Sequence, residues 1–336
     1  MTVRERFART MRFEQVDRMP ILEWATWWDK TVHSWIGQGL EIKPAPGLNQ
    51  GQALQQQMGL DLHLQAWVGF KTAATPSPRG EGLPIVTSME EYERILPTLY
   101  PDRVPIDRER MEEYSRRQAE GSAIVWATIE GPFWGPRTLL GIENHLYSFY
   151  DEPELLHRIN ADIARYNLKI LDALYEYFIP DFITLAEDMS YNNGPMLSEA
   201  LFDEFLLPYY HQVLPSLKER GVPVFIDSDG DITKMVPWFI RAGIDGVLPL
   251  ERQAGVDVNA LRDKYPTFLF IGHYDKMVMP HGEEAMRAEF ERLLPAMRKG
   301  GFIASVDHQT PPGVSLDQYR TYIKLLNEYA VKAVQG

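Results

Sequence analysis

The chain has 336 residues, of which 45% are hydrophobic and 24% are charged. This balance is typical of a globular protein with a sizeable core and excludes a disordered chain. The formal net charge of -13 would repel polyanions, and the lack of cysteine excludes disulfides, thiolate nucleophiles and thiolate metal ligands. Nucleic acid is therefore not expected as a partner. A charged amino terminus and the absence of a long apolar run predict a soluble, cytoplasmic protein without a membrane anchor.

The first predicted elements are a helix and two short strands. Apolar residues at helical spacing predict a helix over residues 2–14, with Thr2 as its amino-terminal cap. Pro20 then opens an apolar segment that ends near Trp24, which we interpret as the first strand of a barrel, and residues 62–68 are a second candidate strand. Residues 70–121 contain several prolines and glycines, and we interpret them as an excursion from the barrel.

From residue 122 onward, strand and helix patterns alternate. Strands are predicted over residues 122–128, 181–187, 223–228, 244–249, 267–272 and 301–306. Helices are predicted over residues 151–178, 198–220, 232–242, 257–264, 282–299 and 315–333. Parallel strands need such crossovers, and about eight strands close a barrel. The sequence thus predicts an α/β fold, a single (β/α)8 TIM barrel that forms one domain over residues 1–336, with an open doubly wound sheet as the alternative.

Two aspartates follow the strand at 223–228, at the end of the strand where parallel α/β proteins keep their reactive sites. Asp227 and Asp229 are two residues apart, so both side chains lie on one face, about 6.5 to 7 Å apart. Such a pair can bind a divalent cation, share a proton or hold a cationic substrate. His308 follows the last strand and is expected at the same site. Helix capping is the alternative role for Asp229 and for Asp231.

Other polar residues also follow predicted strands. Glu187 and Asp188 are adjacent, so only one of them can face the barrel axis. Asn193 lies in the next loop, where its amide suits a polar ligand. Polar residues at strand ends also stabilise loops, which is the alternative role for all of these residues. The strand at 267–272 is followed by three further candidates, His273, Asp275 and Lys276.

Aromatic residues near the strand ends are candidates for the wall of a substrate pocket. Trp24 and Trp27 follow the first predicted strand, and Trp134 lies in the turn after the strand at 122–128. Glu130 belongs to the same turn and is a further candidate for substrate binding. Core packing is the alternative for the tryptophans and the expected role of Trp35.

Some common motifs are missing from the sequence. No glycine-rich dinucleotide or phosphate loop follows a strand, and neither Gly-x-Ser-x-Gly nor His-Glu-x-x-His occurs. The sequence therefore argues against a nucleotide cofactor, a serine hydrolase and a zincin.

Motifs along nearly the whole chain resemble the uroporphyrinogen decarboxylase (URO-D) superfamily. They are Asp17-Arg18-Met19-Pro20, Glu130-Gly131-Pro132, Glu187-Asp188-Met189 followed by Asn193-Gly194-Pro195-Met196, and Gly300-Gly301-Phe302-Ile303 leading to His308 and Pro311-Pro312. The resemblance implies one α/β barrel with a deep cleft at the carboxyl ends of its strands. The superfamily includes true decarboxylases and corrinoid-linked methyltransferases of the methylcobamide:coenzyme M type, and fold membership does not choose between them.

The chain departs from both branches of this superfamily. Its residues 24–30 replace the paired-arginine motif that binds the carboxylates of uroporphyrinogen, which argues against decarboxylation of uroporphyrinogen itself. The zinc-binding His-x-Cys pair and later cysteine of the methyltransferases match Asp227, Asp229 and His308 here. The resemblance therefore implies a harder metal site, in which zinc remains an option beside magnesium, manganese and ferrous iron, or a site without metal.

The leading hypothesis is a one-carbon, or methyl, transfer to or from a small organic substrate. In this hypothesis Glu187 or Asp188 is the general base, and His273 or Lys276 orients the acceptor. The resemblance implies a corrinoid as methyl carrier and a corrinoid protein as partner, and a homodimer is a further expectation. The first alternative is decarboxylation of a small or tetrapyrrole-like carboxylic acid, with Asp227 or Asp229 stabilising positive charge in the transition state. The second is a ligand-binding homologue that has lost catalysis.

Overall fold

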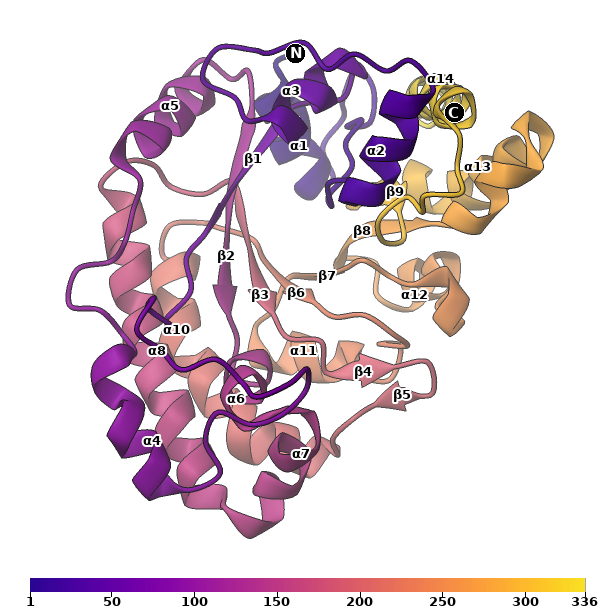
Figure 1. The fold of residues 1–336 in the computed structure, drawn as a ribbon. Helices are drawn as coiled ribbons and strands as arrows, with labels where there is room; N and C mark the ends of the chain where they lie inside the picture. The colour runs from indigo at the N-terminus through magenta and orange to yellow at the C-terminus, as the bar shows by residue number, and fades with distance from the viewer. Residues whose placement is uncertain (336) are drawn as a thin grey trace.

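In a computed structural model, which describes residues 1–335, the chain forms a curled, seven-stranded parallel sheet. The strand order is β1-β2-β3-β6-β7-β8-β9, so every crossover joins neighbouring strands (Figure 1). The strands are β1 His63–Trp67, β2 Ile124–Glu130, β3 Phe182–Ala186, β6 Val224–Asp227, β7 Gly246–Leu248, β8 Leu269–Tyr274 and β9 Phe302–Val306. This arrangement confirms the predicted α/β fold and places the carboxyl ends of the strands at one edge of the sheet.

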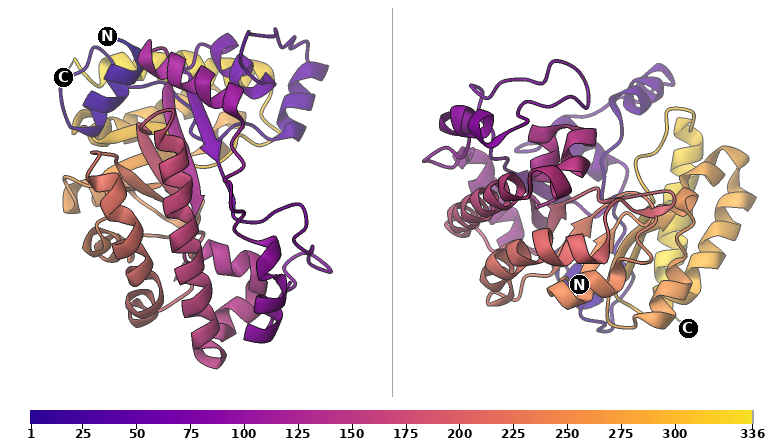
Figure 2. Two further views of the ribbon diagram at one scale, coloured as in Figure 1. Left: turned by 90° about the vertical axis from the view of Figure 1, so that its left-hand side faces the viewer. Right: turned by 90° about the horizontal axis from the view of Figure 1, so that it is seen from below.

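Helices surround the curled sheet (Figure 2). They are α1 Val3–Met11, α2 Asp29–Gly37, α3 Gln50–Gln57, α4 Met89–Ile95, α5 Arg108–Ala119, α6 Trp134–Leu140, α7 Ile142–Asp151, α8 Pro153–Tyr175, α9 Glu199–Leu201, α10 Leu207–Lys218, α11 Val236–Ala242, α12 Val258–Lys264, α13 Glu283–Arg298 and α14 Leu316–Lys332. Within residues 1–335, no helix is both long and apolar enough to span a membrane.

The predicted first strand is wrong, because residues 20–24 form no strand in the structure. The segment nevertheless lies between the two edge strands of the sheet. On one side, the Asp61 amide donates to the Ile21 carbonyl at 2.7 Å, and His63 Nε2 lies 2.6 Å from the Glu23 carbonyl oxygen. On the other side, Trp24 Nε1 donates to the Val306 carbonyl at 3.1 Å. The sheet therefore has seven strands instead of eight, and an irregular segment occupies the seam between β1 and β9.

Several smaller elements differ from the prediction. The expected helix at 198–220 is divided into α9, one π-helical turn at Phe202–Leu206 and α10. The hairpin of β4 Ser190–Tyr191 and β5 Gly194–Pro195 occupies what was expected to be a loop. The excursion at 70–121 carries α4 and α5, and an antiparallel bridge between Lys71 and Leu99 joins two of its own segments.

The apolar core has two layers. The larger layer lies between the sheet and its covering helices and includes residues from Val16 to Ala333. The smaller layer fills the interior of the curled sheet, where Phe7 of α1 packs on Phe182 with ring centroids 5.2 Å apart and Phe182 stacks on Trp126 at 4.9 Å. Helix α1 thus covers the end of the sheet opposite the candidate site.

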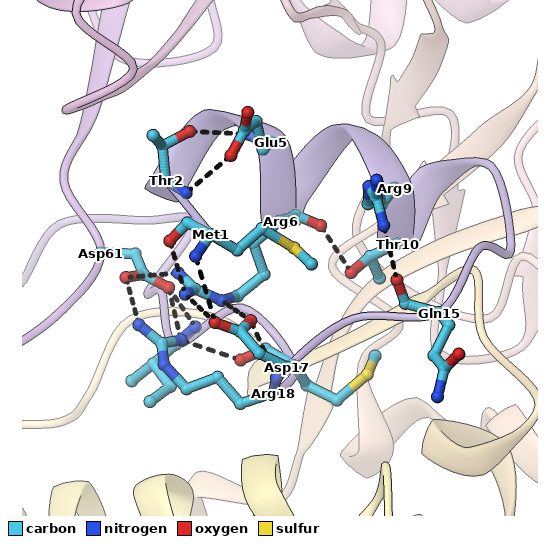
Figure 3. A network of polar contacts seen from close by, with 12 residues as sticks. Met1, Thr2, Glu5, Arg6, Arg9, Thr10, Gln15, Asp17, Arg18 and Asp61 are labelled. Carbon is cyan, nitrogen blue, oxygen red and sulfur yellow. Dashed lines mark hydrogen bonds and ion pairs between the residues drawn. The ribbon is translucent and has the colours of Figure 1, made fainter.

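Charged residues join α1, the segment before residue 20 and the start of β1 (Figure 3). Arg6 binds Asp17 through Nε and Nη2 at 2.7 and 2.8 Å, and Arg18 binds Asp61 through two nitrogens at 2.8 and 2.6 Å. The Asp61 side chain is 6% exposed and also accepts a hydrogen bond from the Ile21 amide at 2.9 Å. This network fixes the irregular segment next to β1.

Candidate active site

Seven polar side chains gather where β3, β6, β7, β8 and β9 end, and we name this group the strand-end cluster. Its members are Asp188, Asp227, Asp229, Glu251, Lys276, Asp307 and His308. All but Glu251 and Asp307 were singled out as site residues from the sequence. The parallel register explains their meeting, because the carboxyl ends of these strands share one edge of the sheet.

Asp229 lies at the centre of the cluster. Its backbone amide donates to Asp188 Oδ1 at 3.3 Å, and its Oδ2 lies 3.7 Å from His308 Nε2. The latter distance is longer than a direct hydrogen bond. The Asp229 side chain is 40% exposed and that of His308 is 29% exposed, so both can be reached by a small molecule.

Burial and nearby charges shift the pKa values of three members of the cluster. Burial, with repulsion from Asp188 and Glu251, raises the pKa of Asp229 to about 7. Burial and the charges of Asp188 and Asp229 raise the pKa of Asp227 well above its usual range. Burial and the Lys276 charge lower the pKa of His308. Near neutral pH, Asp229 therefore exchanges a proton readily beside a neutral imidazole.

The remaining members border this centre. Lys276 Nζ donates to Asp307 Oδ1 at 3.0 Å, and the Arg252 amide donates to Asp307 Oδ2 at 3.1 Å. Glu251 Oε2 accepts a hydrogen bond from the Gly230 amide at 2.9 Å. Sequence reasoning missed Glu251, which follows the short strand β7, and the only signal was its place after a strand end.

Glu187 lies outside the cluster although it is adjacent to Asp188. Its side chain is 1% exposed and accepts hydrogen bonds from the Phe133 amide at 2.8 Å, the Trp134 amide at 3.3 Å and the Tyr210 hydroxyl at 2.5 Å. The backbone turns at Asp188, which has a φ of 44°, so the two carboxyl groups reach different surroundings. In this structure Asp188 is the one that belongs to the cluster, while Glu187 anchors the turn after β2.

His273 also points away from the cluster. Its Nδ1 lies 2.8 Å from the Leu250 carbonyl oxygen, and its Nε2 is 3.3 Å from the Val258 amide and 3.2 Å from Arg292 Nη1. The cause is a backbone turn at Gly272 and His273, with φ of 115° and 70°, which interrupts the alternation of side chains along β8. A side chain at Gly272 would collide with the Pro249 carbonyl, so only glycine fits this turn.

The other predicted site residues lie at varied distances from the cluster. Trp24 borders it, with its ring 6.1 Å from that of His308, whereas Trp27 is buried against Trp35 and Tyr319. Asn193 is exposed at the tip of the β4–β5 hairpin. Asp275 Oδ1 accepts hydrogen bonds from the Met277 amide of its own loop at 2.8 Å and from Gln253 Nε2 of the loop after β7 at 2.6 Å.

Two further candidates lie at the end of β2 and in the turn after it. Glu130 is 8% exposed, and burial raises its pKa. Trp134 is half-buried under the guanidinium of Arg137, 5.2 Å from its ring. The structure records no contact of either side chain with the strand-end cluster.

The predicted metal ligands do not fit a metal ion as they are arranged. Among residues 1–335, no three His, Asp or Glu side chains lie close enough together to hold one ion. This includes the predicted ligands Asp227, Asp229 and His308. The divalent metal therefore remains a prediction from the sequence.

The curled parallel sheet with polar strand ends defines an α/β barrel-type fold of the kind that carries enzyme sites. The sequence profile of the uroporphyrinogen decarboxylase (URO-D) family matches residues 68–329. The chain belongs to this family, as the resemblance predicted.

A solved structure at 15% identity shares this fold. A methyltransferase from Methanosarcina mazei superposes with a TM-score of 0.68 over 98% of this chain and 99% of that one, at 15% identity. A putative vitamin-B12 independent methionine synthase from Listeria monocytogenes has a TM-score of 0.44 over 95% and 97% of the two chains, at 11% identity. No curated protein matches the sequence.

Proposed function

We propose that this protein transfers a methyl group to a small organic acceptor and that Asp229 is the general base. The observation that supports it is the accessible Asp229 carboxyl group, with a pKa of about 7, beside a neutral His308 at 3.7 Å. A base with such a pKa is suited to removing a proton near neutral pH. The fold shared with a methyltransferase is compatible with this reaction class but does not specify it.

The proposed step is a nucleophilic substitution. The hydroxyl or thiol of the acceptor gives its proton to the Asp229 carboxylate, and the freed electron pair forms the new bond to the methyl carbon. The bond between that carbon and the donor breaks, and its electron pair stays with the donor. In this proposal a methylated corrinoid on a partner protein is the donor substrate.

The charge of the cluster favours this reaction over decarboxylation. A carboxylate substrate would approach the carboxyl groups of Asp188, Asp229 and Glu251, and Lys276 is already paired with Asp307 at 3.0 Å. Repulsion of like charges would oppose its binding. A neutral or cationic acceptor meets no such opposition.

The first prediction concerns Asp229. Asp229→Asn should lower kcat/KM by about 10²- to 10⁴-fold, because an amide cannot accept the proton in a general-base step. Turnover of the wild-type protein should rise as the pH increases through about 7, where Asp229 loses its proton. The measurement is demethylation of methylcobalamin, followed by absorbance, with a set of thiols and alcohols as acceptors.

Asp231→Asn is the matched control. Asp231 lies two residues away, and its Oδ1 accepts a hydrogen bond from the Thr233 amide at 2.9 Å. The control should retain the wild-type rate. Unchanged turnover in Asp229→Asn would contradict the proposal. Release of carbon dioxide without use of the methyl donor would indicate the decarboxylase, and binding of an acceptor without any turnover would indicate the silent homologue.

A further inference from the structure

A cavity of about 410 Å³ lies between β1 and the helices α2, α3 and α5. Its volume is in the range of about 300 to 1,000 Å³ that is typical of small-molecule sites. No residue of the strand-end cluster lines it. The lining residues used below are Trp27, Leu54, Gln52, Gln55, Gln65 and Tyr114.

The cavity adjoins the irregular seam of the sheet. The segment at 20–24 follows β1 as far as Glu23, whose carbonyl oxygen lies 2.6 Å from His63 Nε2. The segment then leaves β1, and the Trp24 amide donates to Ser305 Oγ at 3.2 Å on the opposite edge. Within residues 1–335, no strand pairs with this edge of β1. The Gln55 side chain therefore accepts the hydrogen bond from the His63 amide, at 3.3 Å, that a neighbouring strand would otherwise accept.

The deep part of the cavity is polar and carries no charge. Gln55 is 2% exposed, and its Oε1 is used by His63, while within residues 1–335 its Nε2 has no hydrogen-bond partner. Gln52 Nε2 donates to the Tyr114 hydroxyl at 2.9 Å, and Gln65 Nε2 donates to Thr128 Oγ1 at 2.8 Å, which leaves Gln65 Oε1 without a partner among the described residues. The Gln55 side chain is almost fully buried, so the donor that it leaves unpaired at the cavity is available to a ligand or to water.

The lining also determines the charge that a ligand can carry. His63 is buried beside Gln55, and burial lowers its pKa to about 4, so it is neutral at physiological pH. The charged lining residues, Asp29 and Arg110, are exposed at the rim. An ion in the deep part would lose its hydration without gaining a partner of opposite charge.

We propose that this cavity is a binding site for a small, neutral, polyhydroxylated molecule such as a sugar or cyclitol. Hydroxyl groups are both donors and acceptors, so they match the free Gln55 Nε2 and Gln65 Oε1. Trp27 and Leu54 supply the apolar part of the lining against which the carbon skeleton packs. The site does not depend on the methyl transfer proposed above.

The site adjoins the strand-end cluster through one loop. Gln309 Nε2 donates to the Thr26 carbonyl at 2.7 Å, Thr26 lines the cavity, and His308 precedes Gln309 in the chain. The cavity is thus a neighbouring site with its own lining.

The test measures binding of neutral and charged probes to the full chain. The neutral probes are methyl β-D-glucopyranoside and myo-inositol, the charged probes are glucuronate and glucosamine, and the measurements are saturation-transfer NMR and calorimetry. At least one neutral probe should bind, more tightly than either charged probe. Gln55→Met should weaken that binding about five- to tenfold, as expected for one lost hydrogen bond to a neutral group.

Gln56→Met is the matched control, because Gln56 is exposed on the same helix and does not line the cavity. It should bind like the wild type. Gln55→Met could fail to fold, because the His63 amide loses its acceptor. In that case Gln65→Met provides the same test, since Gln65 is half-buried and lines the same cavity. Failure of both neutral probes to bind, tighter binding of a charged probe, or equal affinity in the Gln55 or Gln65 variant and the Gln56 control would overturn the proposal.

Discussion

Glu187 and Asp229 show how position determines the chemistry of one functional group. Burial is the largest cause of the raised pKa in both, to about 8 for Glu187 and about 7 for Asp229. Glu187 is enclosed by two backbone amides and the Tyr210 hydroxyl, whereas the Asp229 side chain is 40% exposed. A carboxyl group that neither solvent nor substrate reaches contributes to structure. We therefore expect the protonation of Glu187 to affect the free energy of unfolding.

Replacement of Glu187 by glutamine tests this expectation. Between pH 4.5 and about 8, the folded protein keeps a proton on Glu187 that the unfolded chain releases. The free energy of unfolding therefore falls as the pH rises through this window, by at most about 1.4 kcal/mol per pH unit for one proton. Glu187→Gln mimics the protonated group and should reduce this slope in urea unfolding measured across the window. Equal slopes in the two proteins would contradict the assignment.

The sequence was sufficient to predict part of the candidate site. Asp227, Asp229 and His308 follow predicted strands, and parallel strands bring such positions to one edge. His273 also follows a predicted strand, but the backbone turn at Gly272 directs its side chain towards Leu250 and Val258 and away from the cluster. Glu251 was missed because a lone glutamate after a short strand has no distinctive pattern.

Among the elements, helix α1 covers the interior end of the curled sheet. Phe7 is 1% exposed and packs on Phe182. Phe7→Ala should lower the free energy of unfolding by about 3 to 5 kcal/mol, because the truncation leaves a cavity that the rigid sheet cannot fill. Tyr150→Ala on α7 is the control, since Tyr150 is 73% exposed and should change stability by less than about 0.5 kcal/mol. Comparable losses in both variants, measured by urea unfolding, would rule out this role for α1.

Strands were predicted correctly where a run of apolar residues marked them in the sequence. The buried strands β2, β3, β6, β7, β8 and β9 begin with apolar runs, which a parallel sheet covered by helices requires. Residues 20–24 also have an apolar start, but Glu23 uses its side chain to bind Ser305 and the Val306 amide, at 3.1 and 3.3 Å, instead of pairing its backbone in a regular ladder. The small β4–β5 hairpin depends on tertiary contacts that no local pattern encodes.

At the scale of the whole molecule, the seam between β1 and β9 depends on contacts between distant parts of the chain. The Met19 amide donates to the Ala330 carbonyl at 2.9 Å, which joins the segment before the seam to α14 (Figure 2). Asp61 then binds this segment to β1 through Arg18 and the Ile21 amide. Loss of the Asp61 charge should therefore weaken the contact between residues 18–21 and β1 and lower the stability of the entire fold.

Asp61→Asn should lower the free energy of unfolding by about 3 to 5 kcal/mol, because it removes a buried carboxylate that pairs with Arg18 at 2.6 Å and lies 3.8 Å from Arg6. Asp17→Asn is the control, since Asp17 binds Arg6 from a side chain that is 45% exposed and its loss should cost no more than about 1 kcal/mol. Urea unfolding at neutral pH measures both, and a lower midpoint with an unchanged slope would identify a loss of native stability. If the two variants lost equal stability, burial at the seam would not be the source of the effect, and the segment at 20–24 would have to be held in place by its contacts with β9 and α14.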